Sequence, residues 1–151
     1  NYLFISPTAS GAVTRGSISD ADPGFNHEEF TDGPIQNNGL TKHYAMVFDD
    51  ANNEMTLYID GTLVSSNLMT IPLSAISPNL GYLAKSLYPD SYLRGNIDEV
   101  RIYNYALNAN HVLGNYENGP DFINAVPEPS SYAMAAFGIA GLIGVVRRRR
   151  K

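Results

Sequence analysis

The sequence predicts an all-β sandwich followed by a single membrane-spanning helix. Up to about residue 105, short β-type runs alternate with clusters of Gly, Pro, Asn, Asp and Ser, and helical periodicity is nearly absent. Of the 151 residues, 44% are hydrophobic and only 17% are charged, which is typical of a globular chain. Near the C-terminus, a charge-free run is followed directly by five basic residues.

The charge of the chain is distributed unevenly. Residues 1–146 hold 5 basic and 15 acidic side chains, a net charge of −10, whereas residues 147–151 are all basic. An acidic body without a basic patch argues against nucleic acid as a partner, because phosphates are neutralised by clustered Lys and Arg. The chain has no Cys, which excludes disulfides, thiolate zinc sites and thiol nucleophiles.

The alternation of apolar and polar residues predicts seven strands in this order: 2–6, 12–17, 43–49, 55–60, 62–66, 80–85 and 97–104. Residues 19–38 are polar and rich in Gly, Pro, Asp and Asn. We interpret them as a long surface loop or a region of irregular strands.

The clearest local signal is the dipeptide Asp60-Gly61 between two apolar runs. This dipeptide favours the positive φ angles of a two-residue hairpin turn. The turn predicts two cross-strand pairs, Leu57 with Val64 and Ile59 with Thr62. By the period of two, Met55 shares one face with Leu57 and Ile59, and we expect that face to belong to the core.

The last predicted strand has an apolar side and a polar side. Val100 and Ile102 alternate with Glu99, Arg101 and Tyr103. We therefore expect Val100 and Ile102 to lie on a core, with the acid beside the base on the other side.

A short helix is predicted after this strand. Asn108 is a candidate N-cap, Val112 and Tyr116 recur at helical spacing together with Leu113, and Gly119-Pro120 ends the pattern. The predicted division is a β-sandwich over residues 1–118, a linker over 119–125 and a C-terminal signal over 126–151.

Three blocks of the chain resemble a known family: residues 43–49 (HYAMVFD), 57–61 (LYIDG) and 95–107 (GNIDEVRIYNYAL). In that order they are similar to the second half of a laminin G-like domain of the concanavalin A-like lectin/glucanase superfamily. The resemblance implies a jelly-roll β-sandwich whose first, N-terminal strands lie upstream of Asn1. We therefore expect the apolar face around Leu57, Ile59 and Val64 to lack its partner sheet. Family members commonly have a Trp where this chain has Thr41.

The C-terminus resembles the PEP-CTERM sorting signal of Gram-negative bacteria. The motif is Val126, Pro127, Glu128, Pro129 and Ser130, and the basic end is Arg147, Arg148, Arg149, Arg150 and Lys151. Between them, residues 130–146 would form roughly 26 Å of helix against a hydrocarbon core of about 30 Å. The resemblance implies processing by an exosortase-type membrane protease. It also implies an exported protein, first an inner-membrane precursor and then located at the cell surface or in the extracellular matrix.

A soluble C-terminal helix or a basic nucleic-acid-binding run is the alternative interpretation of this end. A soluble helix would have polar residues at every third or fourth position, and the charge-free run does not.

Two sets of candidate site residues follow from the family resemblance and from the loop composition. Family relatives often hold a structural Ca²⁺, and here Asp98, Asp60 and Asn96 could supply its oxygen ligands. The alternative is that Asp98 caps a backbone bulge and Glu99 pairs with Arg101. Sugar faces stack on aromatic rings while Asn and Asp hold the hydroxyls, which makes Tyr88, Tyr92 and Asp90 candidate ligand-binding residues.

No catalytic residue is predicted. The neighbouring carboxylates Asp49/Asp50 and Asp98/Glu99 would point to opposite faces of a strand, and His43 is interpreted as a structural histidine. The function hypothesis is a non-catalytic carbohydrate- or protein-binding and adhesion module whose partners are an extracellular glycan or a surface protein. The alternative is an accessory binding domain of an upstream secreted glycosidase or other hydrolase, so activity of the full-length protein stays open.

Overall fold

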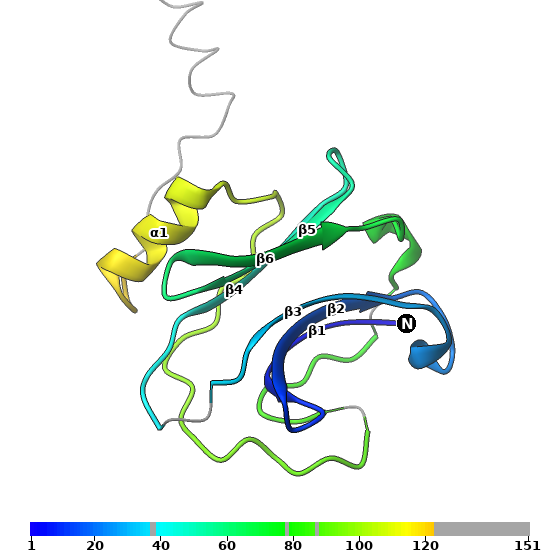
Figure 1. Cartoon of the computed structure of the whole chain (residues 1–151), viewed down its shortest axis with the longest axis horizontal. Coiled ribbons are helices and arrows are strands. Elements are labelled where there is room, and N and C mark those ends of the chain that lie inside the picture. The colour runs from blue at the N-terminus through cyan, green and yellow to red at the C-terminus, as the bar shows by residue number, and fades with distance from the viewer. Residues whose placement is uncertain (37–38, 78, 87, 123–151) are drawn as a thin grey trace, which may run out of the picture.

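The computed structural model describes residues 1–36, 39–77, 79–86 and 88–122. Its strands form two antiparallel sheets that pack face to face (Figure 1). The first sheet has the order β1 (Tyr2–Ala9), β2 (Val13–Ser19), β3 (Glu28–Pro34). The second sheet has the order β4 (Tyr44–Asp49), β5 (Glu54–Ile59), β6 (Thr62–Leu68). The other elements are the short 3₁₀ helices η1 (Gly24–His27) and η2 (Leu73–Ala75) and the helix α1 (Ala109–Asn118). The all-β prediction is confirmed, and the sheets are consistent with a jelly roll.

Five of the predicted strands are present, and they correspond to β1, β2, β4, β5 and β6. The region interpreted as a loop or irregular strands contains a regular strand, β3. It pairs with β2 along its whole length, from Glu28 opposite Ser19 to Pro34 opposite Val13. Its sequence EEFTDGP is polar on both sides, since Glu29 and Thr31 contact residues of the second sheet and the chain after it, whereas Asp32 lies on the opposite side. Pairing with β2 along its whole length outweighs this unfavourable strand composition.

The β5–β6 hairpin turns at Asp60 and Gly61, whose φ angles are 51° and 73°, as the sequence predicts. Ile59 pairs with Thr62, which confirms one predicted pair. The pairing of Leu57 with Val64 was wrong, since Leu57 lies opposite Ser65. The register shifts between Leu57 and Tyr58, so β6 carries one extra residue at this point, as in a β-bulge.

The main core lies between the two sheets. Its buried residues are Ile18 from β2, Met55 from β5, and Met69 and Ile71 after β6. Leu57 is 0% exposed and also lies on this side of β5. The two sheets approach closely at Gly33, where an added Cβ would lie 2.7 Å from Val64 Cγ1.

The expectation that the apolar hairpin face lacks a partner sheet was therefore wrong. Leu57 and Ile59 are buried and Val64 is half-buried. The strands β2 and β3 of the first sheet pack against β5 and β6 and cover this face.

The predicted helix is confirmed as α1. Asn108 is its N-cap, and the Asn108 side-chain oxygen accepts a hydrogen bond from the His111 backbone N–H at 2.9 Å. Val112 is fully buried and packs with Val47 and Tyr58 on the outer face of the second sheet. The helix thus covers the face of the second sheet that points away from the first (Figure 1).

The predicted strands 80–85 and 97–104 were wrong, because the structure has no strand over the described residues of either range. The expected burial of the apolar side of the second range was also wrong, since Val100 is 50% and Ile102 is 94% exposed.

The polar side of residues 99–103 turns toward α1 instead. Arg101 donates two hydrogen bonds to Glu99 at 2.5 and 2.7 Å, which confirms the pairing weighed from the sequence. Asn115 of α1 donates to the Tyr103 hydroxyl at 3.1 Å, and Arg101 donates to Asn115 at 3.4 Å. These hydrogen bonds decide which side of the segment faces inward.

Within the described part of the chain, no helix is both long enough and apolar enough to cross a membrane. The predicted sorting motif (126–130), membrane helix (130–146) and basic end (147–151) lie outside the described residues, as does part of the predicted linker.

Candidate ligand-binding site

The outer face of the first sheet gathers aromatic and charged side chains. Because Ile18 points into the core, its neighbours Ser17 and Ser19 point to the opposite side of β2. The strand register then places the following side chains on that outer face: Tyr2, Phe4, Arg15, Ser17, Glu28, Phe30 and Asp32. We call these seven residues, together with Tyr88, the aromatic face.

One end of the aromatic face is a stacked ion pair. Arg15 Nε and Nη2 donate to the two carboxylate oxygens of Asp32 at 2.7 and 2.8 Å. The hydrogen bonds to Asp32 raise the pKa of Arg15, and burial opposes them only in part. The Arg15 guanidinium lies 3.7 Å from the Phe30 ring centroid, and Phe30 keeps 38% of its surface exposed. The structure therefore holds an exposed ring beside fixed polar groups.

The other end is a row of aromatic rings. Tyr2 lies between Phe4 and Tyr88. Its ring centroid is 5.4 Å from that of Phe4 and 6.3 Å from that of Tyr88. Burial raises the pKa of Tyr2, and Tyr88 and Glu28 raise it further, so its phenol stays protonated. Tyr88 itself is 39% exposed.

Tyr88 reaches this row because the chain after η2 crosses the outer side of the first sheet, away from the second sheet (Figure 1). The structure thus brings one predicted ligand residue, Tyr88, to the aromatic face. The other two, Tyr92 and Asp90, are exposed on the same segment. Neither makes a hydrogen bond or ring contact with any described residue.

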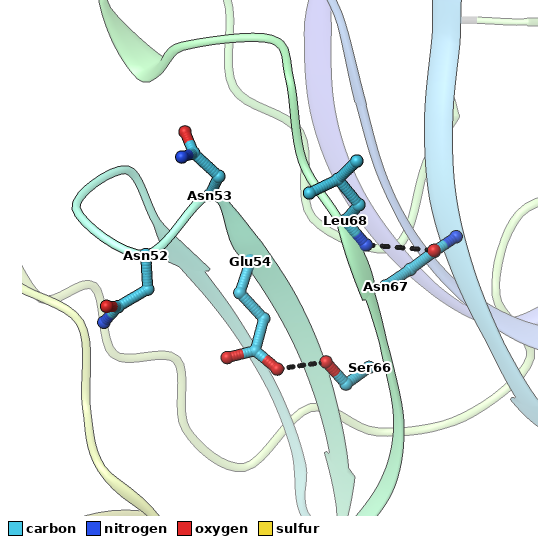
Figure 2. A pocket seen from close by; sticks show the side chains of 6 residues that line it. All are labelled: Asn52, Asn53, Glu54, Ser66, Asn67 and Leu68. Atoms are coloured by element: carbon cyan, nitrogen blue, oxygen red, sulfur yellow. Dashed lines mark hydrogen bonds between the residues drawn. The ribbon is translucent and has the colours of Figure 1, made fainter.

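A shallow polar pocket lies where the β4–β5 turn meets the end of β6 (Figure 2). Its volume is about 390 Å³, and its lining residues are Asn52, Asn53, Glu54, Ser66, Asn67 and Leu68. We call it the amide pocket. Asn67 Nδ2 donates to the backbone oxygen of Phe30 at 2.9 Å, so the pocket borders β3.

Sequence reasoning missed the amide pocket and most of the aromatic face. The run of Asn and Asp in the β4–β5 turn was a visible signal, but it indicates a turn first. Both sites depend on pairing between strands, and the pairing of β3 in particular was not predicted.

The predicted calcium ligands are not gathered around one point by any described contact. The Asp60 carboxylate accepts hydrogen bonds from Lys42 Nζ and, at 3.0 Å, from the His43 backbone N–H. Burial alone would raise the pKa of Asp60, but these hydrogen bonds outweigh it and lower the pKa. Asp98 and Asn96 are exposed. No three acidic or histidine side chains of the described residues could jointly hold a metal ion, so the calcium site stays a prediction.

The residues considered for catalysis have structural surroundings. Asp49 caps the β4–β5 turn by accepting from the Ala51 N–H at 3.0 Å, and Asp50 accepts from the Leu73 N–H at 3.0 Å. The His43 ring lies 6.0 Å from the Tyr116 ring, and burial lowers the pKa of His43 despite the opposing effect of Asp60. His43 is therefore neutral at pH 7.

Two family models match successive parts of the chain. The model of the Concanavalin A-like lectin/glucanases superfamily (Laminin_G_3) matches residues 3–113, and the model of the PEP-CTERM protein-sorting motif matches residues 125–151. No curated protein matches the chain.

Among solved structures, the chain is similar to residues 221–444 of an S-layer domain-containing protein from Clostridium thermocellum. The identity is 27% and the TM-score is 0.45, and the match covers 76% of this chain. The chain spans 55% of that structure's chain.

The two family matches confirm both resemblances. The C-terminal match indicates export and membrane-anchored sorting to the cell surface. Since the first match covers most of the chain and includes the two β-sheets, the chain belongs to the concanavalin A-like lectin/glucanase superfamily and ends in a PEP-CTERM sorting motif.

Proposed function

We propose that this chain is a non-catalytic binding and adhesion module of a Gram-negative bacterium that holds an extracellular glycan on its aromatic face. After processing by the exosortase, the module resides at the cell surface or in the extracellular matrix. The observation that supports this most directly is the exposed Phe30 ring beside the Arg15–Asp32 pair, on the same face as Tyr88.

The chemistry of this face suits a sugar. The C–H groups of a pyranose pack against an aromatic ring, while its hydroxyls donate to carboxylates and accept from guanidinium N–H groups. Arg15 and Asp32 are 20% and 31% exposed in their side chains, so their outward edges can reach a ligand. Because the pair is already formed, little conformational entropy is lost when the ligand binds.

The carboxylates on the aromatic face are better suited to binding than to catalysis. A retaining glycosidase needs two carboxyls about 5 Å apart, one as nucleophile and one as acid. Asp32 is engaged by Arg15, and Glu28 accepts from the Ser17 hydroxyl at 2.6 Å. We therefore assign the face to binding and expect no hydrolysis of bound glycan.

The proposal predicts different effects for two tyrosines on the same segment. Tyr88→Ala removes a ring of the aromatic face, so its affinity for a glycan identified on a glycan array should fall about tenfold, in line with the loss of one stacked ring. Tyr92→Ala removes a 69% exposed ring that makes no ring contact with a described residue, and it should leave the affinity unchanged. Titration of the full-length chain and both variants with that glycan measures the difference.

Two results would contradict the proposal. One is an array in which the full-length chain binds no glycan, and the other is a loss of affinity in Tyr92→Ala with none in Tyr88→Ala. Thermal unfolding of Tyr88→Ala serves as the control for folding, because Tyr88 packs against the buried Tyr2.

A further inference from the structure

The amide pocket offers polar atoms that the fold does not use. Ser66 donates to Glu54 Oε1, which leaves Glu54 Oε2 open to the pocket (Figure 2). The Asn52 amide nitrogen donates to Asp49 at 2.8 Å, and its side-chain oxygen makes no hydrogen bond with a described residue. The Asn53 side chain likewise has no hydrogen-bond partner among the described residues. One carboxylate oxygen of Glu54, the side-chain oxygen of Asn52 and the amide group of Asn53 are thus available to a ligand.

The backbone around the pocket is held in place before any ligand binds. Asn53 has a φ of 52°, and its backbone oxygen accepts from the Met69 N–H at 2.8 Å. Glu54 pairs with Leu68 across β5 and β6, and Asp49 caps the turn that carries Asn52. A pocket on such a fixed frame loses little entropy on binding.

The negative charge at the pocket favours a positively charged ligand. Glu54 is the one charged residue among its six lining residues. The chain outside the basic C-terminus carries 15 acidic and 5 basic side chains. This field repels sulfated or uronic-acid sugars and attracts a cation. An ammonium group has three donors and no acceptor, which matches a carboxylate oxygen beside amide oxygens.

We propose that the amide pocket binds an amino sugar unit whose amino group is unsubstituted, with the ammonium on Glu54 and the amide groups on the sugar hydroxyls. A volume of about 390 Å³ is near the lower end of the usual range for ligand pockets, which suits a single sugar unit of a longer glycan. Glu54 and Ser66 lie on the side of the second sheet that points away from the first sheet, so the amide pocket is a site separate from the aromatic face. The inference rests on the proposed function and names the class of glycan.

The test uses two probes of equal length, the β-1,4-linked tetramer of glucosamine and the corresponding tetramer of N-acetylglucosamine. The full-length chain should bind the glucosamine tetramer about tenfold more tightly, as expected for a charge-assisted hydrogen bond. Glu54→Gln keeps the shape of the side chain and removes its charge, so it should abolish this preference. Glu117→Gln, an exposed position on α1, changes the net charge equally and should keep the preference.

Three outcomes would overturn the inference: a preference that survives in Glu54→Gln, a preference that Glu117→Gln lowers as much as Glu54→Gln, or no binding of the glucosamine tetramer. None of these outcomes changes the result of the Tyr88 and Tyr92 comparison. The experiments therefore test ligand binding at the amide pocket separately from glycan binding at the aromatic face.

Discussion

Leu57→Ala is expected to lower the free energy of unfolding by about 3 kcal/mol, within the roughly 2–5 kcal/mol seen for buried Leu truncations. Leu57 belongs to β5 and is 0% exposed. Its side chain lies between the two sheets, next to Gly33, where the sheets approach closely. The truncated side chain leaves a cavity that neither sheet can fill. For a chain of this size, the melting temperature should fall by roughly 6–12 °C.

Leu63→Ala is the matched control on the same hairpin. Leu63 is 56% exposed, so the same truncation should change the stability by less than about 0.5 kcal/mol. Thermal unfolding of the full-length chain in detergent, followed by circular dichroism, compares the two variants. Equal stability of Leu57→Ala and the parent would contradict the placement of β5 against the first sheet.

Glu128→Ala is expected to stop C-terminal processing, so that the full-length, membrane-bound precursor accumulates. Glu128 is the charged residue between the two prolines of the sorting motif, and it belongs to the part of the chain outside the described residues. Its replacement leaves unchanged the apolar run 130–146, which is the run that we expect to insert into the membrane. Mass spectrometry of the C-terminus in a strain with the processing machinery measures the outcome.

Glu117→Ala is the control, because it removes the same charge outside the sorting motif. In that variant and in the parent, the surface protein should lack the basic residues 147–151. An intact basic end on the surface-exposed parent would contradict processing at this motif.

The β5–β6 hairpin and α1 could be predicted because their signals are local. Asp60-Gly61 determines a turn within four residues, and Asn108 caps the helix whose N–H groups follow it. Val112 at helical spacing indicates the buried side of α1 without knowledge of its partner. The exact cross-strand register could not be predicted, since the extra residue near Val64 depends on packing against the first sheet.

Tertiary contacts decided the elements that were predicted wrongly. The polar composition of β3 indicates a loop, yet the strand is held by β2 and by contacts such as the Thr31 hydroxyl with Ser65 across the sheets at 2.7 Å. For residues 99–103, hydrophobic alternation predicts that Ile102 is buried. The hydrogen bonds of Arg101 and Tyr103 to α1 reverse that orientation, and they cannot be derived from a period of two.

In the candidate site, too, local sequence signals could be read, but contacts between distant segments could not. Composition identified Tyr88 as an aromatic residue on an exposed segment, but it could not separate Tyr88 from Tyr92. The distinction comes from the path of the chain, which brings only Tyr88 of these two against Tyr2. Arg15 and Phe30 had no signal in the sequence, because their stacking requires the pairing of β2 with β3.

Hydrogen exchange with and without bound glycan tests the aromatic face most directly. Between residues 79 and 93, one backbone hydrogen bond joins described residues, Leu93 N–H to Ala84 O, so most amides there should exchange rapidly in the free protein. A glycan on the aromatic face should slow exchange in peptides covering this segment and leave α1 unchanged. Slowed exchange confined to α1 and the outer face of the second sheet would contradict the account.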